Sequence, residues 1–143
     1  MARLLVEKGA SVDLPLTIGD YGSALVVAAY WGRLEIAQLL IEQGASVDLN
    51  VQTGIYGSAL VAAAAGGQTK MVQLLIGQGA SVDLNLQTGI YENAIVAAIS
   101  NRRTEIAQFL IEQGASVNLP LRSGYNGSAL AAAAEHGQPW MVE

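Results

Sequence analysis

Two kinds of apolar pattern alternate along the chain, and residues 56–90 contain one of each. The first kind, ALVAAAA at residues 59–65, is a run of helix formers without a charged side chain. Ser58 precedes this run and can accept a hydrogen bond from a free backbone N–H, so we predict a short helix capped by Ser58. Gly66 and Gly67 come at the end of the run and are expected to terminate the helix.

The second kind of pattern is amphipathic and spans residues 70–78. Its apolar side chains form one wide stripe, whereas its lysine and glutamines point elsewhere, which predicts a longer helix. Thr69 is a candidate cap at the start of this helix, and Gly79 suits the left-handed position just past its end. Residues 80–90 then read ASVDLNLQTGI, and their β-branched and turn-forming residues predict an extended finger or hairpin.

The same succession recurs with a fixed period of 35 residues. The phrase GASVDL, or GASVNL in its last copy, marks the register, and such a period is typical of a repeat array. Its copies begin at Gly9, Gly44, Gly79 and Gly114. We therefore divide the chain, as a single array over residues 1–143, into a half unit at 1–20, full units at 21–55, 56–90 and 91–125, and a partial unit at 126–143.

Neither predicted helix of a unit is long enough to be stable alone in water. Burying one Leu, Ile or Val side chain contributes roughly 1.5–3 kcal/mol, so stacking neighbouring units supplies the stability that a single unit lacks. The alanines of the first helix in each unit are small, which lets these inner helices pack tightly between their neighbours. The pattern therefore predicts an all-α repeat solenoid.

The unit resembles the ankyrin repeat, a unit of about 33 residues with the signature TPLHxA. Here alanine replaces the proline of the signature, and valine or alanine replaces its histidine, so part of the hydrogen bonding of that signature is absent. The finger is longer by about two residues than in that unit, a style similar to the arrays of large fungal ankyrin-repeat proteins. The segments in the place of the signature are SALVVA (23–28), SALVAA (58–63), NAIVAA (93–98) and SALAAA (128–133).

This resemblance implies helix–turn–helix units with extended finger loops, and a function in binding other proteins. It also implies a concave binding surface lined by finger tips and inner helices. We take as candidates the residues that vary between copies around the end of the inner helix, since aromatic and arginine side chains are the usual interface anchors. The predicted protein-binding residues are Tyr30, Trp31, Arg33, Arg102 and Arg103. An alternative stays open, in which Trp31 covers the neighbouring helix end and the arginines are only solvated.

Composition and charge exclude other classes of partner. The net charge is −5 with only seven Lys and Arg, and the one local basic pair, Arg102 and Arg103, is too small for a nucleic-acid groove. No apolar stretch approaches the roughly 18 residues of a membrane span. The polar faces of the second helices have Glu and Gln where interfacial helices have cations. We therefore expect no nucleic-acid or membrane partner, and an intracellular location, in the cytoplasm or alternatively in the nucleus.

The inventory of reactive side chains is small, with no cysteine and one histidine. His136 has no nucleophile or second base near it in the sequence, and no glycine-rich phosphate loop is present. One position of the unit is acidic in most copies, and these side chains could form a ladder of cation ligands. We favour the interpretation that each of them bonds its own backbone and fixes the finger turn. The residues at this position are Asp13, Asp48, Asp83 and Asn118. We therefore expect no catalytic residue, no cofactor and no metal site, and hence no enzyme.

The tyrosines also recur at one position of the unit, at Tyr21, Tyr56 and Tyr91. Repeats share their interfaces by construction, so we expect these side chains to pack adjacent fingers against one another.

Two functions remain open for the array. The first is a non-catalytic protein–protein interaction module. The alternative is a truncated regulatory or sensor segment of a larger multidomain ankyrin protein, which would act by stacking on further repeats. Neither end has a polar capping unit, so we expect a section of a longer array, with end-to-end self-association through poorly covered apolar residues. These residues are Leu4, Leu5, Trp140 and Met141.

Overall fold

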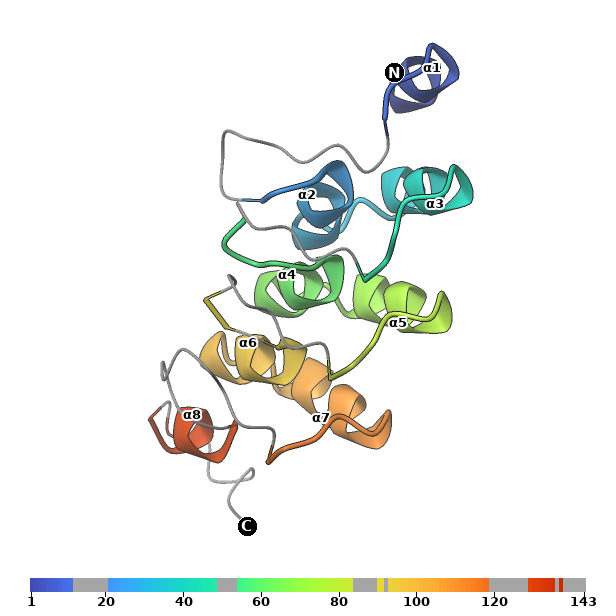
Figure 1. Ribbon diagram of the computed structural model, residues 1–143. Helices are drawn as coiled ribbons and strands as arrows, with labels where there is room; N and C mark the ends of the chain where they lie inside the picture. Colours follow the sequence, from blue (N-terminus) through green and yellow to red (C-terminus); the bar gives the residue numbers. More distant parts are fainter. Residues whose placement is uncertain are drawn as a thin grey trace.

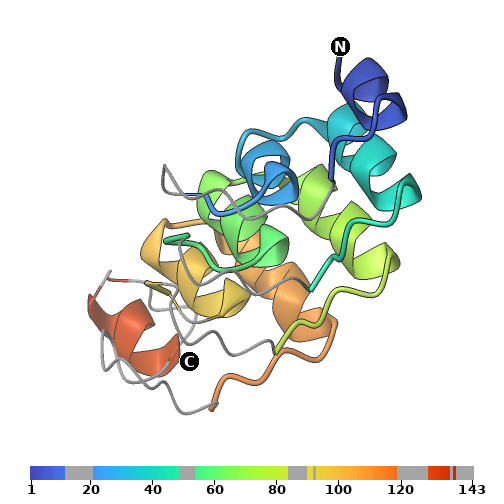
Figure 2. The same ribbon diagram turned by 45° about the horizontal axis from the view of Figure 1, so that its top comes forward.

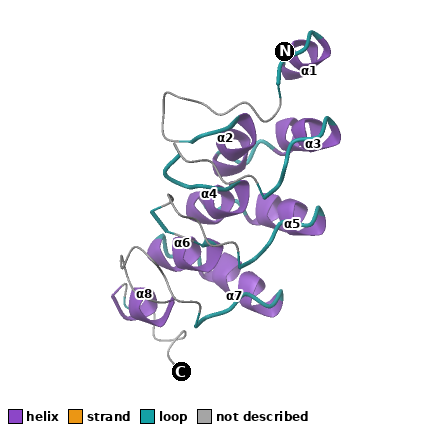
Figure 3. Cartoon of the chain, in the orientation of Figure 1, coloured by secondary structure: helices purple, strands orange, loops and turns teal. Residues whose placement is uncertain are grey.

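The computed structural model describes residues 1–11, 21–48, 54–83, 90–91, 93–118, 129–135 and 137. The described residues form helices joined by turns and loops, with no strand among them (Figure 3). The all-α prediction is therefore confirmed. The helices are α1 Ala2–Glu7, α2 Ala24–Tyr30, α3 Leu34–Glu42, α4 Ala59–Gly66, α5 Thr69–Gly77, α6 Ala94–Ser100, α7 Thr104–Glu112 and α8 Ala129–Glu135.

The helices stand in two parallel columns (Figures 1 and 2). The inner column holds α2, α4, α6 and α8, and the outer column holds α1, α3, α5 and α7. Each inner helix contacts the next along the column, and α2, α4 and α6 each contact the outer helix that follows them in the chain. This arrangement is the repeat solenoid that the fixed period predicts. The boundaries near residues 20 and 125 lie outside the described part, so the division into units stays a prediction.

The core lies along the inner column and between the two columns. Ala62, Ala63 and Ala64 of α4 have no exposed surface, because inner helices contact α4 on both sides. Larger side chains of the outer helices, such as Leu75 and Leu110, are also fully buried and fill the space between the columns. The small inner residues therefore permit the close approach of neighbouring units, and large side chains of both columns, such as Ile95 and Leu75, fill the core.

The inner helices α2, α4 and α6 begin at a buried polar cap. The Ser58 hydroxyl oxygen accepts from the backbone N–H of Val61 at 3.3 Å, which confirms the predicted cap of α4. Ser23 and Asn93 cap α2 and α6 in the same way. The predicted Thr69 cap is wrong, because Thr69 is the first residue of α5 and Gln68 precedes it. Gln68 makes no side-chain cap; its backbone N–H instead donates to the Ala63 carbonyl at 2.9 Å and closes the turn.

The outer helices end at glycines with positive φ, as the pattern predicts for Gly79, whose φ is +97°. The fingers lie largely outside the described residues, so their predicted extended conformation stays a prediction. One link between consecutive fingers is visible, where the backbone N–H of Ile90 donates to the Ile55 carbonyl at 2.7 Å. Four residues singled out in the sequence also lie outside the described part: Asp13, His136, Trp140 and Met141.

Candidate protein-binding surface

All five candidate residues lie where an inner helix turns into an outer helix. Tyr30 ends α2, and Trp31 and Arg33 belong to the turn that leads to α3. Arg102 and Arg103 occupy the corresponding turn between α6 and α7. We call the row formed by residues 30–33, 65–68 and 100–103 the turn edge. Contacts between consecutive turns, given below, place them side by side along the array.

Tyrosines form a continuous stack across three units. The rings of Tyr21 and Tyr56 are stacked with centroids 5.7 Å apart, and those of Tyr56 and Tyr91 are stacked at 6.5 Å. The recurring tyrosines therefore pack on one another, as predicted. Tyr30 joins this stack from the end of α2, with its centroid 5.0 Å from that of Tyr56 and 5.5 Å from that of Tyr21.

Tyr56, at the centre of the stack, has a perturbed phenol. Burial raises the pKa of the Tyr56 phenol well above its usual range, and a hydrogen bond with Tyr30 and the nearby tyrosines add to this effect. The burial is partial, since Tyr21, Tyr30, Tyr56 and Tyr91 are all half-buried. The stack can therefore offer aromatic surface and phenol groups to a partner.

Trp31 is the most exposed aromatic side chain in the described part of the chain, at 55%. Its ring meets the Tyr30 ring edge to face, with centroids 5.2 Å apart and an interplanar angle of 84°. One side of Trp31 is thus supported by the tyrosine stack, while more than half of its surface faces solvent. The sequence is consistent with Trp31 as a cover of the neighbouring helix end or as an anchor, and its exposure leaves surface for a partner.

Consecutive turns are joined by a side chain that reaches back one unit, an arrangement that we call the inter-repeat clasp. The Gln68 Nε2 donates to the Tyr30 carbonyl at 3.1 Å. One period later, the Arg103 Nε donates to the Ala65 carbonyl at 3.3 Å. Arg103 is therefore bonded to the preceding unit, and a direct contact of Arg103 with a partner stays a prediction. Gln68 shares the register of Arg33 and Arg103 but is not among the predicted binding residues.

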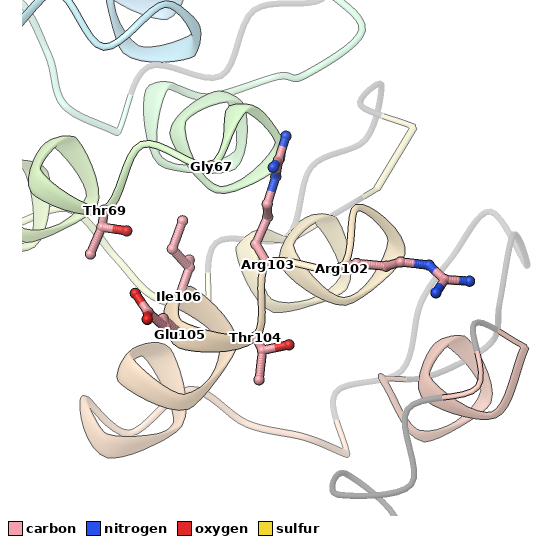
Figure 4. A pocket seen from close by; sticks show the side chains of 7 residues that line it. All are labelled: Gly67, Thr69, Arg102, Arg103, Thr104, Glu105 and Ile106. Carbon is pink, nitrogen blue, oxygen red and sulfur yellow. The ribbon is translucent and has the colours of Figure 1, made fainter.

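Arg102 differs from Arg103 in its backbone conformation and in the direction of its side chain. Its φ is +58°, the only positive value of a non-glycine residue in the described part. Gly32 and Gly67 stand at the same position of the earlier units. Figure 4 shows the Arg102 side chain pointing away from the turn of the second unit, whereas Arg103 points toward Gly67. Arg102 is exposed, so its guanidinium is accessible to a partner.

A hollow of about 290 Å³ lies between the turns of the second and third full units. Arg103 forms one side and Glu105 another, and Ile106 is almost completely buried beside them (Figure 4). The remaining lining comes from Gly67, Thr69, Arg102 and Thr104. A second hollow of the same volume lies between the outer helices α3 and α5 and includes none of the candidate residues. The first hollow therefore adds a small recess to the turn edge, lined in part by Arg103 and Glu105.

The recurring acidic position joins consecutive units. The Asp48 Oδ1 accepts from the backbone N–H of Ser81 at 2.8 Å, and the Asp83 Oδ1 accepts from that of Ser116 at 2.7 Å. Both bonds run to the following unit, whereas the sequence predicted bonds within each residue's own turn, most of which lies outside the described residues. Within the described residues, no group of three or more His, Cys, Asp and Glu side chains is placed to hold a metal ion.

These features define an all-α solenoid built of stacked helix–turn–helix units. A family model described as ankyrin repeats (3 copies) matches residues 57–143, and one described as ankyrin repeats (many copies) matches residues 25–76. The chain belongs to the ankyrin-repeat family. Members of this family generally mediate protein–protein interaction and are typically non-catalytic. A comparison with curated proteins gives no match. No helix in the described part could cross a membrane.

Proposed function

We propose that this chain is a non-catalytic module that binds a protein through the inner-helix side of the array, the concave side implied by the ankyrin resemblance. The observation that supports this proposal is the exposed Trp31 held on the tyrosine stack. Tryptophan, tyrosine and arginine are enriched among the residues that dominate binding energy. Trp31, Tyr30, Arg33 and Arg102 bring these three types to one edge.

Pre-organisation makes the Trp31 site favourable for binding. The edge-to-face contact with Tyr30 already restricts the indole, and Tyr30 is itself in contact with Tyr21 and Tyr56. A partner that covers Trp31 therefore immobilises few additional rotatable bonds. An apolar or aromatic side chain of the partner is the expected occupant, because the surface beside Trp31 consists of tyrosine rings.

The charged side chains along the turn edge favour a second feature in the partner, an acidic residue. Arg33 and Arg102 are exposed cations, and Arg103 and Glu105 line part of the hollow beside them. A carboxylate of the partner can pair with the Arg102 guanidinium with two parallel hydrogen bonds. We therefore propose a partner segment that combines an apolar anchor for Trp31 with an acidic residue for Arg102.

The experiment uses a random-peptide display library selected against the intact chain. Enriched peptides are then tested by calorimetry against Trp31→Ala and against Ile111→Ala as a matched control. Ile111 is an exposed apolar residue of the outer helix α7, with an exposure of 38%. The expected result is a loss of at least about tenfold in affinity for Trp31→Ala and no loss for Ile111→Ala. Equal binding to both variants would contradict the proposed surface.

A further inference from the structure

The outer column of helices has a hollow of its own, away from the turn edge. It lies between the neighbouring helices α3 and α5 (Figure 1), has a volume of about 290 Å³, and is called the outer hollow below. This volume is just below the roughly 300–1,000 Å³ of pockets for small molecules, so the outer hollow suits a single long side chain. Its lining residues are Gln38, Ile41 and Glu42 from α3, and Leu74 and Gln78 from α5 and its C-cap.

The outer hollow combines apolar and polar lining. Ile41 and Leu74 are half-buried and pack against the hydrophobic core, so both side chains are held in place while part of their surface stays accessible. Gln38, Glu42 and Gln78 are exposed. A side chain with an apolar stem and a polar head matches this lining, because the stem can cover the two apolar residues while the head reaches the polar ones.

The polar lining favours a cationic head. Glu42 has a negative charge, and the amides of Gln38 and Gln78 can turn their oxygens toward a cation. The only cation of the helices α3, α5 and α7 is Lys70, in the first turn of α5 and so at the opposite end of that helix from Gln78. The Glu42 carboxylate is therefore available to a positive charge from another molecule.

The ends of the two helices add to the negative potential. Glu42 is the last residue of α3, and Gln78 is the C-cap of α5. Backbone carbonyls at a helix C-terminus have a partial negative charge, which favours a cation there and disfavours a carboxylate. Neither α3 nor α5 has a basic residue in its last turn. A cation in the outer hollow would thus be attracted by Glu42 and by both helix ends.

The junction between α5 and α7 provides a contrast within the same chain. Two lining positions differ there, since Gly77 stands in place of Glu42 and the larger Phe109 in place of Leu74. The second junction therefore lacks the carboxylate and has a bulkier apolar side chain. The other three lining positions keep their residue type, as Gln73, Ile76 and Gln113.

We propose that the outer hollow binds an arginine side chain from a basic segment of a partner protein. The planar guanidinium can donate two parallel hydrogen bonds to the Glu42 carboxylate and further bonds to the amide oxygens of Gln38 and Gln78. Its aliphatic stem lies over Ile41 and Leu74. Lysine has the same charge, but its ammonium lacks the planar set of donors. The proposal goes beyond the proposed function, because no residue of the outer hollow belongs to the turn edge.

The test uses the intact, isotope-labelled chain and the capped peptide AARAA as the probe. Amide signals are followed by NMR as the peptide is added, and the largest shifts are expected at the side-chain amides of Gln38 and Gln78. Glu42→Gln should weaken binding by about fivefold, the effect of one well-placed surface ion pair. The same peptide with citrulline, a neutral isostere of arginine, should bind the parent chain about fivefold more weakly than AARAA does.

Glu112→Gln is the matched control. Glu112 is the last residue of α7, as Glu42 is of α3, so this variant removes the same charge from the same register and should leave the affinity unchanged. Circular dichroism checks the fold of every variant. Equal weakening by the two variants would overturn the proposal, since the peptide would then respond only to net charge. A lysine peptide, AAKAA, that binds as tightly as AARAA would overturn the assignment to arginine.

A gain of binding gives an independent test. Gly77→Glu together with Phe109→Leu transfers the two differing residues of the outer hollow to the junction between α5 and α7. A Cβ at Gly77 would meet no atom within 4 Å, so the new side chain begins in open space. This variant should show a second set of peptide-induced shifts, at Gln73 and Gln113, that the parent chain lacks. A folded variant without the second set would overturn the proposal, because the carboxylate and the apolar lining would then not be what binds arginine.

Discussion

Arg103 donates from its Nε to the carbonyl oxygen of Ala65 in the preceding unit, at 3.3 Å. Ala65 lies in the last turn of α4, where backbone carbonyls have no partner within the helix. Gln68 makes the same contact one unit earlier, to the carbonyl of Tyr30. Each clasp therefore satisfies a helix end of its predecessor, and two different side chains perform this role because both have a planar N–H donor on a flexible stem.

The first prediction concerns Gly67, over which the Arg103 guanidinium lies. A Cβ at this glycine would stand 2.8 Å from the Arg103 Cζ, and its φ is +75°. Gly67→Ala should lower the free energy of unfolding by about 2 kcal/mol, because it adds backbone strain and displaces the clasp. Urea unfolding measures this loss.

Gly79→Ala is the matched control for that experiment. Gly79 has a φ of +97°, but a Cβ there would meet no atom within 4 Å. Its cost should be the backbone strain alone, about 1 kcal/mol. When Arg103 is also replaced by alanine, Gly67→Ala and Gly79→Ala should lower the free energy of unfolding by the same amount, since the clasp is then already absent. A persisting difference would mean that the clasp is not what Gly67 accommodates.

The second prediction concerns Arg102, which adopts a positive φ where Gly32 and Gly67 stand in the earlier units. Arg102→Gly should raise the free energy of unfolding by about 0.5–1 kcal/mol, because the relief of strain exceeds the entropy that glycine gains in the unfolded chain. Arg102→Ala keeps the strained backbone and should give no gain. Thermal unfolding of the two variants distinguishes them, and a gain for alanine would indicate that charge rather than backbone is responsible.

The elements that the sequence predicts well are those that depend on local chemistry. The Ser58 cap needs only a hydroxyl three residues before a backbone N–H, and Gly79 needs only a left-handed φ. The cap position and the glycine position both recur every 35 residues, so the repeat makes them easy to recognise in the sequence. The tyrosine stack follows in the same way, because identical side chains at one register of a stacked array must lie near one another.

The contacts between units could not be assigned from the pattern alone. Asp48 has the residue type of a side chain that bonds its own turn, yet its acceptor faces Ser81 of the next unit. The distance between stacked units decides which bond forms, and no residue spacing encodes that distance. The clasp position holds Gln68 in one unit and Arg103 in the next, because the contact needs only a long side chain with an N–H donor. The same variability drew attention to Arg103 as a binding residue.

The third prediction is a pH dependence that comes from Tyr56. Burial, followed by the hydrogen bond with Tyr30, raises the pKa of this phenol in the folded chain. In the unfolded chain the phenol loses its proton near pH 10, while the folded chain still holds it, so the unfolded state binds fewer protons there. The contribution to stability is therefore complete below about pH 10 and is lost as the pH rises further.

Tyr56→Phe isolates this contribution. The free energy of unfolding of the parent chain should fall more steeply between about pH 9 and 11 than that of the variant. Tyrosine absorbance followed over the same range should show one phenol of the parent that titrates late, and this signal should be absent from the variant. Identical slopes for the two chains would contradict the assignment to Tyr56.

The fourth prediction concerns the carboxylates that join consecutive units. Asp83→Ala should lower the free energy of unfolding by about 1 kcal/mol, because the backbone N–H of Ser116 loses its acceptor at a half-buried position. Asp48→Ala should cost less, since its bond to Ser81 is exposed to water. Asp83→Asn keeps an oxygen in place and should retain most of the stability. Glu112→Ala, at an exposed position of α7, is the control and should change stability by less than about 0.5 kcal/mol. Equal losses for Asp83→Ala and Glu112→Ala in urea unfolding would show that the net charge, and not the bond between units, governs the effect.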